Sequence, residues 1–184
     1  MTSPAQRWDG IYENTAEPGE PADFVVDAAE LLPTSGTAVD LAGGPGATAL
    51  WLAARGLDTT LVEVSRRALD VAIETAAQRG VALEAVQHDL EADVQLGRCW
   101  DVAVVSNFLH RPLLAALETL LNPGGVALVR VATVTNLERH ERPSARFLVE
   151  SDELPSLCHG LEVIEFAEGW FDDRHEARLI ARRP

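Results

Sequence analysis

The segment from Thr37 to Gly56 constrains the fold of this chain more than any other stretch of its sequence. It reads TAVDLAGGPGATALWLAARG: a short apolar run ends near Asp40, and a loop with three glycines in four residues follows. A helical pattern begins directly after the loop and stops at Gly56. This order predicts a strand, a glycine-rich loop and a helix. Glycine lets such a loop turn sharply and approach a ligand closely.

Further strands and helices alternate along the chain. Apolar and β-branched runs predict strands at 37–41, 59–64, 83–87, 101–106 and 126–133, whereas periodic or capped stretches predict helices at 24–32, 46–55, 65–79 and 112–121. The last third predicts a short helix near 151–158 and two strands, 161–167 and 176–181, close enough to form a hairpin. We therefore expect an α/β fold: a doubly wound, mostly parallel, Rossmann-like sheet of seven strands that ends in an antiparallel hairpin.

Length and charge narrow the class of protein. A chain of 184 residues is expected to form one domain (1–184), with 1–22 as an N-terminal arm and candidate lid and 23–184 as the Rossmann-like core. The net charge of −14 argues against nucleic acid as a partner. The sequence contains no apolar run of membrane-spanning length, no signal peptide and no Cys/His metal pattern. We therefore expect a cytoplasmic protein without a metal, and leave its oligomeric state open.

Polar residues follow several predicted strands at their carboxyl ends. In a doubly wound sheet, ligands bind beyond these ends, where the strand order reverses. This rule brings four parts of the sequence to one edge: Asp40 with the glycine loop, Glu63, His88 with Asp89, and the segment 107–111.

Two ligand classes fit this edge. The spacing of Gly44, Gly46 and Ala49 matches the dinucleotide pattern, and Glu63 stands where a carboxylate can accept ribose hydroxyls, so an NAD-linked oxidoreductase is one alternative. Asp40, however, would repel a pyrophosphate. A carboxylate there suits a ligand that carries an ammonium and a sulfonium group.

The order of the motifs resembles class I S-adenosylmethionine-dependent methyltransferases, and more narrowly the tellurite-resistance-type small methyltransferases. The motifs are Asp40–Gly46, Glu63, Asp89-Leu90, Asn107–Pro112 and Asn122–Gly125, together with Trp8-Asp9-x-x-Tyr12 at the start and Arg142-Pro143 followed by Phe147-Leu148. The likeness covers nearly the whole chain. The chain departs from the family pattern at Gly43, where cysteine is usual, at Glu63, where aspartate is usual, and at Phe108, where tyrosine is usual.

This resemblance implies S-adenosylmethionine as the cofactor and methyl transfer to a small-molecule acceptor by in-line displacement. The cofactor-binding residues that it implies are Asp40, Ala42, Gly43, Gly44, Gly46, Glu63, Val64, Asp89, Leu90 and Asn107. On the acceptor side we expect His110 and Arg111 as catalytic residues, and Trp8, Tyr12 and Arg142 as substrate-binding residues. A second alternative is a sensor or assembly partner that binds the cofactor without transferring its methyl group.

Overall fold

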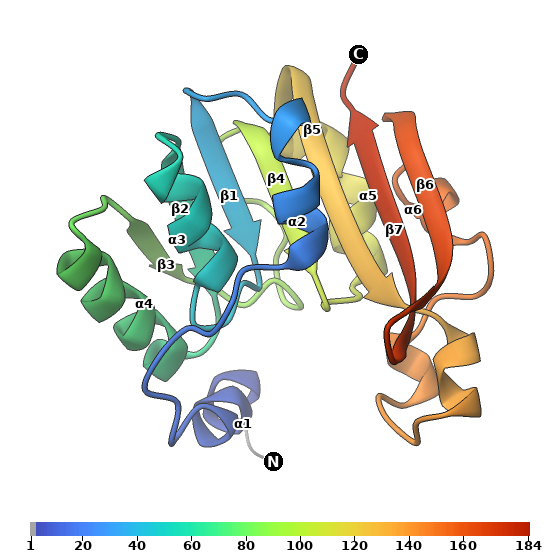
Figure 1. Ribbon diagram of the computed structural model, residues 1–184, viewed down its shortest axis with the longest axis horizontal. Coiled ribbons are helices and arrows are strands. Elements are labelled where there is room, and N and C mark those ends of the chain that lie inside the picture. Colours follow the sequence, from blue (N-terminus) through green and yellow to red (C-terminus); the bar gives the residue numbers. More distant parts are fainter. Residues whose placement is uncertain (1–2) are drawn as a thin grey trace.

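One seven-stranded sheet, in the order β3-β2-β1-β4-β5-β7-β6, organises the computed structural model, which describes residues 3–184 (Figure 1). The strands are β1 (Thr37–Leu41), β2 (Asp58–Glu63), β3 (Glu84–Gln87), β4 (Trp100–Ser106), β5 (Leu121–Ala132), β6 (Glu162–Phe171) and β7 (Arg174–Arg182). Strands β1 to β5 run parallel, whereas β7 is antiparallel to both of its neighbours. The predicted mostly parallel sheet with an antiparallel C-terminal hairpin is confirmed.

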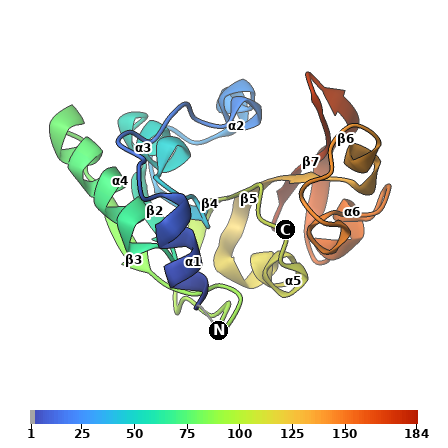
Figure 2. The same ribbon diagram turned by 90° about the horizontal axis from the view of Figure 1, so that it is seen from below.

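Helices cover both faces of the sheet, with α2 to α4 on one side and α5 and α6 on the other (Figure 2). The α-helices are α1 (Pro4–Ile11), α2 (Asp23–Asp27), α3 (Ala47–Ala54), α4 (Arg66–Arg79), α5 (Arg111–Leu120) and α6 (Leu154–Leu157), and the 3₁₀ segments are η1 (Ala29–Leu31), η2 (Val134–Glu138) and η3 (Ala145–Phe147). None of the described helices has the length and apolar character that a membrane crossing requires.

The central strands are continuously apolar because both of their faces are buried. In β4, Val102 and Val104 belong to the core under α2 and α3, whereas Ala103 and Val105 belong to the core under α5. Successive side chains of a strand point to opposite faces, so an unbroken apolar run is what a doubly covered strand requires. Helix α4 shows the expected caps: the Ser65 hydroxyl accepts the N–H of Ala68 at 3.2 Å, and Gly80 ends the helix with φ 67°.

The structure corrects several predicted elements. The helix expected over 24–32 is split at Ala28 into α2 and η1, and the 3₁₀ segment ends where Leu32 turns extended (φ −91°, ψ 144°), the conformation that the following Pro33 favours. The turn expected at 122–125 is an irregularity within β5, whose pairing with β4 shifts register at this point. Residues 88–99 connect β3 to β4 without a helix, and the strands of the C-terminal hairpin extend to Phe171 and Arg174.

Helix α1 lies within residues 1–22, which were expected to form an N-terminal arm and lid but for which no helix was predicted. Its start carries a capping box, in which the Ser3 hydroxyl accepts the N–H of Gln6 and the Gln6 side chain accepts the N–H of Ser3. Figure 1 shows α1 beyond the carboxyl ends of β1 and β4, the edge at which the sequence places the ligand.

Candidate active site

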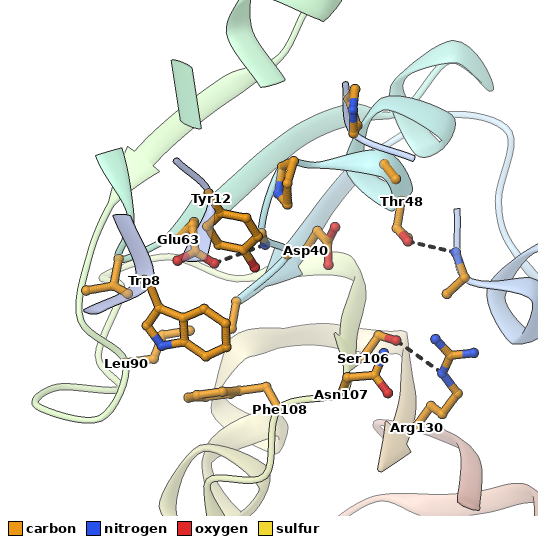
Figure 3. A pocket seen from close by; sticks show the side chains of 18 of the residues that line it. Trp8, Tyr12, Asp40, Thr48, Glu63, Leu90, Ser106, Asn107, Phe108 and Arg130 are labelled. Carbon is orange, nitrogen blue, oxygen red and sulfur yellow. Dashed lines mark hydrogen bonds between the residues drawn. The ribbon is translucent and has the colours of Figure 1, made fainter. Parts of the chain in front are cut away.

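A cavity of about 540 Å³ opens at the carboxyl ends of the parallel strands (Figure 3). Most of the predicted site residues line it: Trp8, Tyr12, Asp40, Ala42, Gly43, Gly44, Glu63, Val64, Asp89, Leu90 and Asn107. These residues come from the ends of four strands and from α1, so the topology assembles them as the switch-point rule expects.

Two residues other than glycine adopt left-handed backbone angles at the ends of neighbouring strands that face the cavity. Ala42 follows β1 with φ 56°, and Asn107 follows β4 with φ 60°. Residues with a Cβ rarely adopt this conformation, and such residues cluster at ligand sites where the surrounding structure holds them in place. The glycine loop that follows Ala42 continues the sharp turn, with Gly44 at φ 55°.

Asp40 is buried beneath the glycine loop. Its side chain is 2% exposed, and its Oδ2 accepts the N–H of Ala49 at 3.1 Å. Burial raises the pKa of this carboxyl group from 3.8 to about 7, and the nearby Glu63 adds to that rise, whereas the Ala49 hydrogen bond opposes it. A cationic ligand above the loop would favour the ionised form.

The loop has no room for a side chain at Gly43. A Cβ at this position would overlap the Asp40 carboxyl group and lie 2.6 Å from Cδ1 of Leu61. We expect Gly43→Ala to lower the free energy of unfolding by about 1–3 kcal/mol, because a buried carboxylate and a core leucine must both move. Denaturant unfolding of the two proteins measures this loss.

Gly169→Ala is the matched control for Gly43→Ala. Gly169 lies in β6, and a Cβ there would meet no atom of residues 3–184 within 4 Å. Its alanine variant should unfold at nearly the wild-type denaturant concentration. Equal stability of all three proteins would contradict the close packing of Asp40 against the loop.

Glu63 connects the glycine loop to the start of α4. Its Oε2 accepts the N–H of Gly44 at 3.0 Å, and its Oε1 accepts the N–H of Ser65 at 2.9 Å. The side chain is buried, and burial raises the pKa of this carboxyl group although the two N–H bonds oppose the rise. Each carboxylate oxygen keeps a further lone pair, so both can accept a hydrogen bond from a ligand.

Helix α1 covers one side of the cavity. The rings of Trp8 and Tyr12 stack with centroids 5.8 Å apart, and the Tyr12 hydroxyl lies over Gly44, where it would be 2.7 Å from a Cβ. Burial, together with the charge of Glu63, raises the pKa of Tyr12 to about 12. The aromatic pair therefore stays neutral and forms a largely apolar wall.

Asp9 holds α1 against the start of α4. Its Oδ1 accepts the Ser65 hydroxyl at 2.6 Å and the N–H of Arg67 at 3.2 Å, and these bonds keep the pKa of the carboxyl group below its usual value. We expect Asp9→Ala to increase tryptic cleavage after Arg7 about fivefold or more, because a lost charge-assisted bond costs roughly 1–3 kcal/mol. Timed proteolysis measures the rate.

Glu13→Ala is the control for the cleavage experiment. Glu13 lies in the same arm, and its substitution removes the same charge. Its carboxylate accepts no hydrogen bond within residues 3–184. A cleavage rate raised equally by both substitutions would show that charge, rather than the Asp9 contact, holds α1 in place.

Four predicted residues lie outside the cavity lining. Gly46 begins α3 with φ 83° and packs against Leu61 and Ala72. Arg142 lines a separate cleft beside the C-terminal hairpin. These two residues support the fold or another surface, and the structure does not bring Arg142 to the predicted substrate site.

The two predicted catalytic residues also lie outside the cavity lining. Arg111 binds Glu153 through Nε at 2.7 Å and through Nη2 at 2.9 Å. The His110 ring packs against Phe108 with centroids 6.1 Å apart, and its buried Nδ1 has no hydrogen-bond partner among the described residues. Arg111 therefore ties α5 to Glu153, and neither Arg111 nor His110 is among the described residues that line the cavity.

The cavity also contains residues that the sequence analysis missed. Thr48, Ser106, Phe108, Arg130 and Asp23 line it. Arg130 carried a signal, because a charged residue interrupts the apolar run of β5. Thr48 accepts the N–H of Ala22 at 3.1 Å and so connects α3 to the segment before α2, a contact that no local pattern indicates.

Comparison with known proteins identifies one protein family. Residues 38–125 match the model of the methyltransferase domain family. No curated protein sequence matches the chain significantly.

Solved structures share the fold over nearly the whole chain at low identity. TehB from Haemophilus influenzae is 19% identical with a TM-score of 0.76, over 97% of this chain and 68% of TehB. The N-methyltransferase NodS from Bradyrhizobium japonicum WM9, in complex with S-adenosyl-L-homocysteine, is 16% identical with a TM-score of 0.72, over 98% of both chains. Magnesium protoporphyrin IX methyltransferase from Synechocystis PCC 6803, with bound S-adenosylmethionine, is 15% identical with a TM-score of 0.65, over 98% of this chain and 79% of that one.

Proposed function

We propose, from the membership of residues 38–125 in the methyltransferase domain family, that this chain is an S-adenosylmethionine-dependent methyltransferase of class I. It transfers the methyl group to a small-molecule acceptor by in-line displacement. The observation that carries the proposal is the pair of buried carboxylates, Asp40 and Glu63, on either side of a glycine loop that faces the cavity. Within this proposal the chain is one cytoplasmic domain, in which residues 1–22 form the lid and residues 23–184 form the catalytic core.

The residues of the cavity fit this cofactor. Glu63 offers two oxygens to the ribose hydroxyls, and Asp89 with Leu90 offers polar and apolar contacts to the adenine. Trp8 and Val64 add apolar surface of the kind that a purine ring needs.

The methionine end of the cofactor has its own candidate partners. The loop backbone from Ala42 to Gly44 approaches without side chains in the way, and Asp40 supplies negative charge beneath it. The Asn107 side chain faces the same space. Buried negative charge would oppose a pyrophosphate, which disfavours the NAD-linked alternative.

When bound, the cofactor supplies a methyl group on a sulfonium; the acceptor's lone pair forms the new bond, and the electrons of the broken bond remain on sulfur. The protein has to align the acceptor and exclude water. With His110 outside the cavity lining, we expect an acceptor that is nucleophilic at neutral pH without a general base, such as a thiolate or another anion.

Release of S-adenosylhomocysteine from S-adenosylmethionine over a panel of small thiols, oxyanions, phenols and amines tests the proposal. We expect product with at least one acceptor class from the wild type and far less from Glu63→Ala. Cofactor binding without product over the whole panel would favour the sensor or assembly role.

A further inference from the structure

Arg130 is the only arginine among the described residues that line the cavity, and the chain contains no lysine. It lies on β5, directly opposite Ser106 at the end of β4. We propose that Arg130 binds an anionic group of the methyl acceptor, so that the substrate is a small molecule with a carboxylate or a comparable oxyanion. This inference rests on the proposed methyltransferase function and names its substrate class.

The position of Arg130 separates it from the residues assigned to the ribose. Glu63 ends β2, and two strands, β1 and β4, lie between β2 and β5. Three steps between neighbouring strands amount to roughly 14 Å across the sheet. Figure 3 shows Arg130 and Glu63 at opposite sides of the cavity, with Asn107 and Ser106 next to Arg130. An anion at Arg130 therefore lies toward the acceptor side.

The guanidinium group of Arg130 is held in place before any ligand binds. Its side chain is 13% exposed, its Nε donates to Oγ of Ser106 at 3.2 Å, and its Nη1 pairs with Asp23. A fixed and partly desolvated guanidinium loses little freedom when it binds a carboxylate, and its planar fork matches the two oxygens of that group.

The charges around Arg130 leave an excess of positive charge. Besides its pair with Asp23, Arg130 has its Nε 3.9 Å from Oε2 of the buried Glu176. Arg178 binds Asp23 at 3.1 Å and Glu176 at 3.0 Å, and Arg174 lies 3.6 Å from Glu176, so the two carboxylates are shared among three arginines. This cluster holds three guanidinium groups, those of Arg130, Arg174 and Arg178, against two carboxylates, so one positive charge is not balanced within it. The Asp23 side chain is 55% exposed, which weakens its neutralising effect on Arg130.

The rest of the cavity has the opposite charge. All of its other charged lining residues are acidic: Asp23, which pairs with Arg130, and Glu20, Asp40, Glu63, Asp89 and Glu91. An acceptor with one anionic group is therefore repelled from most of the wall and attracted to a single side. That distribution orients the acceptor, with its anionic group at Arg130 and its nucleophile toward the glycine loop.

The carboxylate that binds Arg130 could belong to the acceptor or to the amino-acid end of the cofactor. The first measurement distinguishes these two ligands. Calorimetry gives the affinity of S-adenosylhomocysteine for the wild type, Arg130→Gln and Arg178→Gln. Arg178 belongs to the same ionic cluster but does not line the cavity, so its variant is the matched control. We expect the three affinities to agree within about twofold. A loss of about tenfold or more confined to Arg130→Gln would assign Arg130 to the cofactor and overturn the inference.

The second measurement compares acids with their neutral amides: mercaptoacetate with mercaptoacetamide, and para-hydroxybenzoate with para-hydroxybenzamide. For pairs that are methylated, the acid-over-amide ratio of kcat/KM should be about tenfold or more higher in the wild type and in Arg178→Gln than in Arg130→Gln, a comparison in which the different thiol or phenol acidities of acid and amide cancel. For pairs that are not methylated, ligand-observed NMR on the protein saturated with S-adenosylhomocysteine should show the acid bound to the wild type and not to Arg130→Gln.

An acid-over-amide ratio that is the same in the wild type and in Arg130→Gln, or the same loss in both variants, would overturn the inference. These outcomes differ from failure of the proposed function. A wild type that does not bind S-adenosylhomocysteine contradicts the methyltransferase proposal, whereas a wild type that binds it without preferring acids contradicts only the role of Arg130.

Discussion

Replacing Glu63 with alanine is expected to weaken the binding of S-adenosylhomocysteine about 100-fold, because two charge-assisted bonds to the ribose at roughly 1.5 kcal/mol each are lost. In the wild type the Glu63 carboxylate accepts the N–H groups of Gly44 and Ser65 at 3.0 and 2.9 Å, and the substitution leaves both groups without this partner. The loop is then no longer held in the shape that faces the ligand. Isothermal titration calorimetry measures the change in Kd.

Glu84→Ala is the control for the Glu63 variant. Glu84 begins the neighbouring strand β3, and its carboxylate binds Arg98 and Thr60 away from the cavity. This variant should bind the ligand with wild-type affinity. A Glu63→Ala protein that is folded by circular dichroism and binds with unchanged Kd would remove Glu63 from the ribose site.

Asp40→Asn is expected to stabilise the protein at alkaline pH. Asp40 is buried, and its pKa rises from 3.8 to about 7 in the folded state. The stability that its protonated form contributes is therefore fully present below about pH 4 and is lost as pH rises through about 7. Asparagine stays neutral at every pH, so at pH 8 the variant should gain up to about 4 kcal/mol, an upper value set by ~1.4 kcal/mol per pKa unit. Denaturant unfolding at several pH values measures the gain.

The same substitution should remove a pH dependence of cofactor binding. A cationic ligand favours the ionised form of Asp40, so the affinity of the wild type for S-adenosylmethionine should rise by up to about tenfold per pH unit below pH 7 and level off above it. In Asp40→Asn the affinity should be weaker at pH 8 and nearly independent of pH. Parallel profiles of the two proteins would contradict the assignment of Asp40 to a cationic ligand.

Asp101→Asn is a control for the stability measurement, because its effect on stability at pH 8 is expected to be opposite to that of Asp40→Asn. Hydrogen bonds from Thr37 and Asn122 lower the pKa of Asp101 below its usual value. Its contribution to stability is present at neutral pH and is lost as pH falls through the lowered pKa. This variant should therefore be less stable than the wild type at pH 8 and should approach it in acid.

The strands and their order along the chain could be predicted because their signals are local. β4 is apolar at every position that both layers cover, and Ser65 and Gly80 mark the ends of α4 by side-chain and backbone chemistry. The helix predicted over 24–32 is too long, and the capping box at Ser3 was overlooked. At Ser3 one capping residue determines where the helix starts, whereas the break at Ala28 has no signal in the local sequence.

The site divides in the same way. Residues at strand ends, such as Asp40, Glu63 and Asp89, could be predicted to meet because parallel strands present their carboxyl ends to one edge. Arg111 has its partner, Glu153, 42 residues away, and such a contact leaves no pattern in the local sequence. The contact between Arg130 and Asp23 spans 107 residues and depends on how the N-terminal arm crosses the cavity.

Calorimetric titration of the wild-type protein with S-adenosylhomocysteine, with NAD as the control, tests the central claim most directly. We expect micromolar binding of S-adenosylhomocysteine at one site per chain and no heat of binding from NAD. Binding of NAD with none of S-adenosylhomocysteine would contradict the proposed cofactor, and with it the role assigned to the two buried carboxylates beside the glycine loop.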